Sequence, residues 1–237
     1  EFARAVLPHG TSTVVTDPHE IANVMGTDGI AYMLQATEGL PVDVRFMLPS
    51  CVPATPLDES GAALEQEDLD GFYSHPRVQG LAEMMNFVGV LAGDEGVLAK
   101  LAAASLADKR TDGHAPDLAG NGLNAYIAAG VRSDHECHDL KDAIAKLERG
   151  QYIMIREGTA ARNLEALVPL LNEKYGSRCL LCTDDRHPGD LLKTGHIDAI
   201  IRRAVALGAD PMAAVRAATL NAAQYFGLHD RGAVAPG

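Results

Sequence analysis

Short β-rich runs alternate with longer helical patterns along the whole chain, and this alternation limits the fold more than any other feature. Strands that alternate with helices pair in parallel through right-handed crossovers. The expected strands are Ser12–Thr16, Val44–Pro49, Val78–Met84, Lys109–His114, Val131–His135, Tyr152–Glu157 and Cys179–Asp184. The expected helices are roughly Ile21–Thr37, Gly96–Ala107, Ala119–Ala129, Leu140–Arg149, Asn163–Lys174 and Asp190–Leu207. Such a series without a Gly-rich phosphate turn favours an α/β fold of the (β/α)8 TIM-barrel type over an open dinucleotide-binding sheet.

The predicted barrel is incomplete, because an eight-stranded barrel needs one more strand than these runs supply. Glu1–Pro8 has the pattern of the end of a helix, so we expect the missing first strand to lie upstream. Residues 1–237 are therefore expected to form one partial barrel domain that holds strands two to eight. With 237 residues, 47% of them hydrophobic, the chain is long enough to bury a full core.

The overall charge and the cysteines restrict the partners and the compartment. A formal net charge of −12 argues against a nucleic-acid partner, and no apolar run is long enough to predict a membrane span. There is no pattern of a secretory signal. Cys179 and Cys182 lie three residues apart in a strand-like run, so their side chains point to opposite faces. We therefore predict packed thiols in a reducing cytoplasm.

Four of the expected strands end in a residue that can bind a metal ion. These residues are Glu83, His114, His135 and Asp184, and Asp185 adds a second carboxylate after the last strand. A lone strand-end His or Asp is usually structural, but four on separate strands are hard to reach by chance. In a barrel the carboxyl ends of the strands converge. Imidazole nitrogen and carboxylate oxygen suit Zn²⁺, Mn²⁺ or Fe²⁺ beside a water, whose pKa a metal lowers to ~7.

Several segments resemble one known family in its order and spacing. The chain is similar to the bacterial adenine deaminases of the amidohydrolase superfamily over Thr16–Val24, Ala82–Val90, Asp112–Pro116, Leu123–Tyr126, Ser133–Glu136 and Cys182–Gly189. The resemblance implies hydrolytic deamination of adenine to hypoxanthine and ammonia, in purine salvage and adenine catabolism. It also implies a binuclear metal centre of Mn²⁺ or Fe²⁺, with Zn²⁺ as another candidate, and a homo-oligomer.

The resemblance implies a role for each candidate metal ligand. Glu83 would bridge the two metals, and His114 and His135 would hold the second. Asp184 would ligate the first metal and exchange a proton with the hydroxide that attacks C6 of adenine.

Further residues are candidates for catalysis or substrate binding, each with an ordinary structural alternative. Asp185 could orient the hydroxide or bind a purine nitrogen, and Glu136 could support His135 or bind substrate. Both residues count as catalytic candidates. The candidates for substrate binding are His19, Glu20, Met84, Asn86 and His187. Helix starts, core packing and turns would account for the same residues equally simply.

The chain departs from the family in one respect. Its members carry an H-x-H pair at the end of the first barrel strand, and no H-x-H occurs in these 237 residues. We also expect the family's carboxy-terminal part to be missing from this chain, after Gly237. We therefore expect this polypeptide alone to be inactive and to bind metal weakly.

Other functions remain open at this point. Another binuclear amidohydrolase acting on a cyclic amide would usually place a carbamylated Lys where Glu83 stands. A related aminopurine could be the substrate, and a degenerate, non-catalytic barrel used for interaction is the alternative outside catalysis.

Overall fold

Strands and helices alternate along the chain in the order that the sequence predicts. The computed structural model describes residues 1–55 and 57–236. By their contacts these residues form two units. The middle unit is Thr13–Asp134, and the terminal unit combines Glu1–Ser12 with His135–Gly237.

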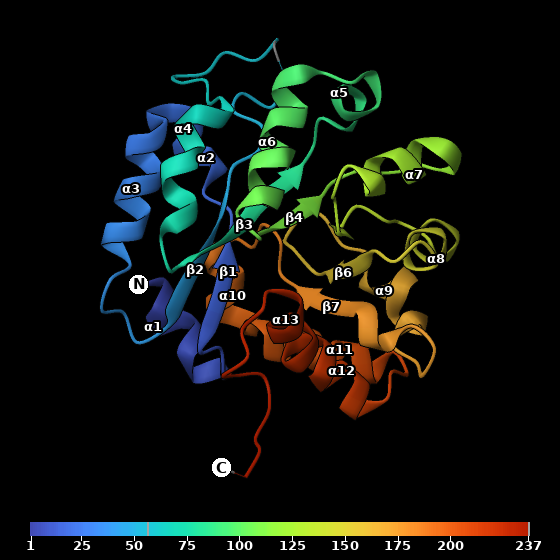
Figure 1. The fold of residues 1–237 in the computed structure, drawn as a ribbon. Coiled ribbons are helices and arrows are strands. Elements are labelled where there is room, and N and C mark those ends of the chain that lie inside the picture. The colour runs from blue at the N-terminus through green and yellow to red at the C-terminus, as the bar shows by residue number, and fades with distance from the viewer. Residues whose placement is uncertain (56, 237) are drawn as a thin grey trace. The chain divides into compact units, whose positions relative to one another are not determined.

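The middle unit contains a parallel sheet with the strands in chain order. It consists of β1 (Thr13–Thr16), β2 (Asp43–Leu48), β3 (Val78–Met84) and β4 (Arg110–Gly113) (Figure 1). Phe46, Leu48 and Leu81 are fully buried and form part of its core. Because all four strands run in parallel, their carboxyl ends lie at one edge of the sheet.

The strand after β4 is shorter than expected. Only Ser133–Asp134 (β5) has strand geometry, whereas the sequence predicts Val131–His135. Polar side chains of this segment accept hydrogen bonds from backbone amides at the end of β4 and just beyond it. The Ser133 hydroxyl accepts from Gly113 N at 3.3 Å, and Asp134 Oδ2 accepts from Ala115 N at 2.8 Å.

The helices of the middle unit lie between its strands in the sequence, and one of the expected helices is divided in two. They are α2 (His19–Met25), α3 (Thr27–Ala36), α4 (Gln66–Asp70), α5 (Phe87–Ala92), α6 (Glu95–Leu106) and α7 (Gly120–Ala128), with a 3₁₀ turn at Gly71–Ser74. The prediction of a single helix over Ile21–Thr37 is wrong. Gly26 has φ of 59°, a left-handed conformation that ends α2 and separates it from α3.

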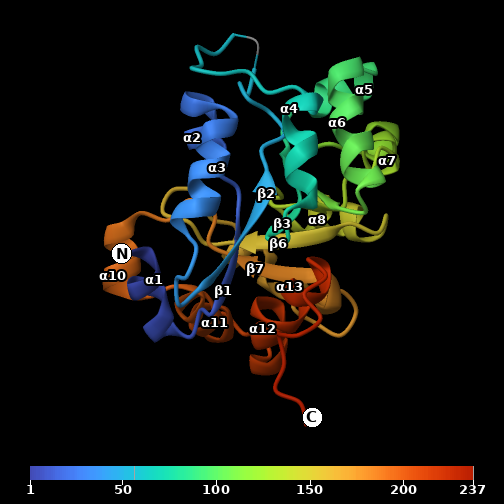
Figure 2. The same cartoon turned by 60° about the vertical axis from the view of Figure 1, so that its left-hand side comes forward.

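The terminal unit contains two paired strands and the remaining α-helices of the described residues. β6 (Tyr152–Arg156) and β7 (Cys179–Cys182) are parallel, in register from Ile153 opposite Cys179. The helices are α1 (Phe2–Val6), α8 (Leu140–Leu147), α9 (Leu164–Leu167), α10 (Pro188–Thr194), α11 (Ile197–Ala206), α12 (Pro211–Ala218) and α13 (Leu220–Tyr225). Figure 2 shows α11 and α12 on the same side of β7. Three 3₁₀ turns lie at Leu7–His9, Val168–Leu170 and Gly176–Arg178.

For two helices of this unit, the length predicted from the sequence is wrong. The helix predicted at Asn163–Lys174 ends at Leu167, because Pro169 lacks an amide hydrogen and a 3₁₀ turn follows. The helix predicted at Asp190–Leu207 is two helices, since Gly195 has φ of 97°. Asp139 and Asp210 cap two helices of this unit, since each side chain accepts a hydrogen bond from the first turn of the helix that follows it.

The core of the terminal unit lies between its strands and helices. Ile153, Ile155 and Leu181 from the strands pack with Leu167 and Ile200 from the helices. Cys179 is buried and Cys182 half-buried on β7, and both are thiols without a disulfide. Among the residues that the structure describes, none of the helices combines the length and the apolar character that a transmembrane span requires.

Candidate metal site

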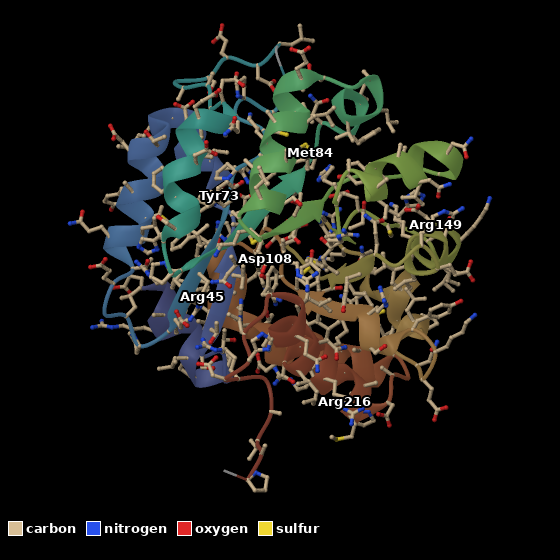
Figure 3. All side chains as sticks on the ribbon, viewed as in Figure 1. Arg45, Tyr73, Met84, Asp108, Arg149 and Arg216 are labelled. Atoms are coloured by element: carbon tan, nitrogen blue, oxygen red, sulfur yellow. The ribbon has the colours of Figure 1, made fainter. Side chains whose placement is uncertain are left out.

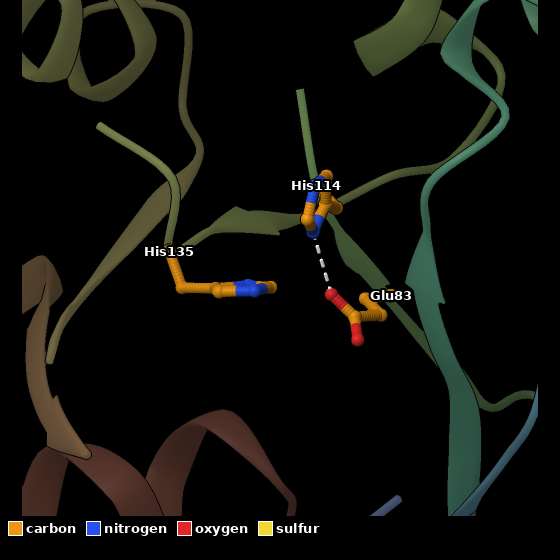
Figure 4. Close-up of side chains that lie close together, drawn as sticks. All are labelled: Glu83, His114 and His135. Atoms are coloured by element: carbon orange, nitrogen blue, oxygen red, sulfur yellow. Dashed lines mark hydrogen bonds and ion pairs between the residues drawn. The ribbon is translucent and has the colours of Figure 1, made fainter. Parts of the chain in front are cut away.

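Glu83 and His114 come together at the carboxyl ends of β3 and β4. Figure 3 labels Met84, the last residue of β3, and Glu83 precedes it; His114 follows β4 directly. His114 Nδ1 lies 2.7 Å from Glu83 Oε2, and a dashed line marks this contact in Figure 4. Both side chains are partly exposed, at 28% and 18%. The sequence therefore predicted two residues that the fold makes neighbours. His135, also drawn in Figure 4, belongs to the terminal unit.

Hydroxyl groups hold the backbone on which these two side chains sit. Ser50 Oγ donates to Glu83 O at 2.5 Å. The Tyr126 hydroxyl donates to Met84 O at 2.7 Å and accepts from His114 N at 3.0 Å. Burial raises the pKa of Tyr126, so its hydroxyl remains protonated and able to donate. The pattern of the sequence gave no signal for these hydrogen bonds.

A second group of possible ligands surrounds Glu83. His19 Nδ1 lies 3.0 Å from Asp17 Oδ2 and 3.9 Å from Glu83 Oε1, and His19 Nε2 lies 3.2 Å from Glu20 Oε1. The Asp17 carboxylate raises the pKa of His19 to about 9, while burial raises the pKa of Asp17 to about 6. Asp17 Oδ1 is buried and has no hydrogen-bond partner among the described residues. Sequence reasoning did not single out Asp17, although its place directly after a strand was the available signal.

The terminal unit holds a cluster of its own around Arg156, the last residue of β6. The Arg156 guanidinium donates to Glu136 Oε1 at 2.5 Å and to Glu136 Oε2 at 2.7 Å, and its Nη1 also donates to Asp184 Oδ2. His135 Nε2 lies 3.4 Å from Glu136 Oε1. Sequence reasoning did not single out Arg156, because an arginine at a strand end is usually solvated. Its position at the carboxyl end of β6 was the one signal for it.

Asp184 has a backbone conformation that most side chains avoid. Its φ is 52°, in the left-handed region, and its Oδ1 accepts a hydrogen bond from Asp185 N at 2.8 Å. A non-glycine residue in such a conformation costs about 1–3 kcal/mol and persists where its surroundings fix it. Asp185 itself is exposed beside it.

The remaining candidates have clear local roles. Asn86 caps α5, accepting from Gly89 N at 2.8 Å, and His187 caps α10, accepting from Gly189 N at 3.1 Å. Met84 is fully buried, whereas the Glu20 side chain is 67% exposed. These positions leave Glu20 and His187 accessible from solvent and place Met84 in the core.

The donor atoms fit a divalent cation. Asp17, His19 and Glu83 in the middle unit each offer a ligand atom within 4.8 Å of the others, and so do His135, Glu136 and Asp184 in the terminal unit. Imidazole nitrogen with carboxylate oxygen is a donor set that Mn²⁺, Fe²⁺ and Zn²⁺ accept.

Known proteins match the chain along its whole length. The model of the amidohydrolase family matches residues 1–237. The chain is 54% identical over 237 residues to the adenine deaminase of Desulfatibacillum aliphaticivorans, and 51% identical over 238 residues to that of Kosmotoga olearia. Each match covers 100% of this chain but only 42% and 41% of the respective relative. The chain therefore spans about two fifths of the length of these curated relatives.

A solved structure has a similar fold. The crystal structure of a dihydroorotase matches with a TM-score of 0.63 at 13% identity, covering 92% of this chain and 63% of that one. At this identity the likeness shows the fold alone. Together with the family match it confirms the expected class, an α/β hydrolase barrel of the TIM type.

Proposed function

Because the chain belongs to the amidohydrolase family of metal-dependent hydrolases, we propose that it is part of an enzyme that deaminates adenine. Water replaces the 6-amino group, and the products are hypoxanthine and ammonia. The observation that carries the proposal is 54% identity to a curated adenine deaminase over the entire chain. Residues 1–237 would supply strands two to eight of the barrel domain.

The proposed metal ligands are Glu83, His114, His135 and Asp184, with Glu83 bridging a binuclear centre of Mn²⁺ or Fe²⁺. The 2.7 Å contact between Glu83 and His114 supports this assignment, because the two side chains already converge. A divalent ion held there would lower the pKa of a bound water towards neutrality. Zn²⁺ suits the same donor atoms.

In this proposal Asp184 transfers the protons of the reaction, and the acidic residues near it bind or orient the reacting groups. Asp184 takes a proton from the attacking water and passes it to the amino group, whose bond to C6 then breaks. Asp185, exposed beside it, hydrogen-bonds the water or a ring nitrogen. Arg156 binds both oxygens of Glu136, which fixes the orientation of this carboxylate beside His135, 3.4 Å away.

The substrate would be held by residues that flank these clusters. His19 lies beside Glu83 and carries a raised pKa, so it can donate to a purine nitrogen on which negative charge develops. Glu20 and His187 are accessible enough to contact the ring edge. Met84 and Asn86 would shape the pocket through packing and the cap of α5.

The cellular setting follows from the reaction. An enzyme that converts a free nucleobase serves purine salvage and adenine catabolism. In line with its free cysteines, we propose a cytoplasmic location. The resemblance to the adenine deaminases implies a homo-oligomer.

The test uses the full-length protein, stripped of metal and reloaded separately with Mn²⁺, Fe²⁺ and Zn²⁺. Ammonia release from adenine is expected with at least one metal. Glu83→Ala and Asp184→Ala should lose this activity, whereas Glu67→Ala, an exposed residue of α4, should keep it. Turnover of a cyclic amide such as dihydroorotate or hydantoin instead of adenine would refute the proposal, and so would full activity of Glu83→Ala.

A further inference from the structure

We propose that Tyr126 is a positioning residue for the metal site, because its hydroxyl fixes the backbone that carries Glu83 and His114. This inference rests on the metal site proposed above. It concerns the geometry of the protein before any ligand binds, and it assigns Tyr126 no contact with substrate or metal.

The hydroxyl lies where the pairing of β3 with β4 becomes irregular. Leu81 is opposite Thr111, but Met84 is opposite Gly113, so three steps along β3 match two along β4. A regular parallel ladder spaces its hydrogen bonds evenly, and an extra residue interrupts that spacing. At this point the Tyr126 hydroxyl donates to Met84 O at 2.7 Å and accepts from His114 N at 3.0 Å. The hydroxyl thus bridges the two strand ends.

The Tyr126 side chain that forms this bridge is held in place by the surrounding core. Tyr126 lies on α7 and is fully buried, so its ring cannot move without disturbing the core. Gly113 leaves room for it, since a Cβ there would lie 3.2 Å from the Tyr126 hydroxyl and 2.2 Å from Ser133 O. A side chain at residue 113 would therefore crowd the Tyr126 hydroxyl, and it would clash more severely with the Ser133 carbonyl.

The two backbone groups that the hydroxyl bridges lie at, or next to, the residues proposed as metal ligands, so their positions set the orientation of these side chains. Met84 O belongs to the residue after Glu83, and His114 N belongs to the ligand itself. Ser50 fixes Glu83 O separately, at 2.5 Å, whereas the Tyr126 hydroxyl bonds to the ends of both ligand-bearing strands and adds to the backbone pairing of β3 with β4. Residues that orient metal ligands through such contacts typically change metal affinity or activity 10–100-fold when they are substituted.

The test compares Tyr126→Phe with Tyr73→Phe in the full-length protein. Both substitutions remove one hydroxyl from a buried tyrosine of the middle unit. The Tyr73 hydroxyl, however, has no hydrogen-bond partner within the described ranges 1–55 and 57–236. The measurements are Mn²⁺ affinity by calorimetry, the visible absorption of the Co²⁺-loaded protein, thermal unfolding without metal, and kcat and KM for adenine.

We expect Tyr126→Phe to weaken Mn²⁺ binding about 10–100-fold, to shift the Co²⁺ spectrum and to lower kcat with KM nearly unchanged. Tyr73→Phe should stay within about twofold of the wild type in each of these, by the same reasoning. If Tyr126→Phe lowers only the unfolding temperature, its role is merely structural and the inference is wrong.

The result also separates this inference from the proposed function. If the wild type deaminates adenine, Glu83→Ala does not, and Tyr126→Phe binds Mn²⁺ like the wild type, only the inference on Tyr126 fails. If the wild type neither binds a divalent ion nor deaminates adenine, both proposals fail.

Discussion

The ion pairs of Arg156 allow a quantitative prediction for Arg156→Gln. The arginine makes three charge-assisted hydrogen bonds, two to Glu136 and one to Asp184. Its side chain is 14% exposed and that of Glu136 is 16% exposed. Removing one partner of a buried ion pair costs about 3–5 kcal/mol, because the other charge stays in a poorly solvated place. Asp184 is more exposed, at 22%, which screens its share.

We therefore expect Arg156→Gln to lower the free energy of unfolding by about 3 kcal/mol. The assay is urea unfolding of the metal-free protein, followed by circular dichroism. Arg202→Gln is the control: Arg202 pairs with Asp198 at 2.7 Å, but its side chain is 65% exposed. An exposed pair of this kind contributes about 0.3–0.5 kcal/mol.

A double-substituted variant shows whether the loss comes from the stranded carboxylate. Arg156→Gln with Glu136→Gln removes the charge of both partners, so the double variant should lose less stability than the two single losses added together. The reasoning would be refuted if Arg156→Gln cost no more than Arg202→Gln, or if the single losses simply added.

Two further predictions concern helix capping and pH. Asp210→Ala should destabilise the protein by about 1 kcal/mol in the same urea assay, because the Asp210 side chain accepts from Ala213 N at the start of α12. An unchanged midpoint would contradict this. Burial lowers the pKa of His196 from 6.5 to about 4, so the unfolded chain takes up a proton first and stability falls as the pH drops from 6.5 to 4. The loss should reach roughly 3 kcal/mol, and His196→Asn should remove that part of the pH dependence; an identical pH profile in the variant would contradict the assignment.

The strands and their order could be predicted from the sequence, because buried parallel strands are short apolar runs with clear ends. Helix breaks were harder. At Gly26 and Gly195 the helical pattern continues on both sides, and only a left-handed φ shows that the helix stops. The pattern could not reveal this, since glycine inside a helix is tolerated at a cost of about 1 kcal/mol.

Part of the candidate site was also predictable. Glu83 and His114 end neighbouring strands, and parallel pairing alone brings such ends together. Sequence reasoning did not identify Asp17, Arg156 or Tyr126 as parts of the site. What places each of them there is the residue that it contacts in the folded protein. Tyr126 is on a helix 12 residues after His114 in the chain, yet it bonds to the backbone of both strand ends. That relation depends on packing, which residue spacing does not encode.

The terminal unit joins two segments that lie far apart in the sequence, and this affects the order in which its parts are made on the ribosome. Thr11 Oγ1 lies 2.7 Å from His196 Nδ1, a contact between residues 185 positions apart. At about 5–20 residues per second, the segment Glu1–Ser12 waits roughly 10–40 s for its partners to emerge. The middle unit has all its residues much earlier and can fold during that interval. Residues Glu1–Ser12 are thus made well before the partners against which they pack, so they cannot dock until residues beyond His135 have been made.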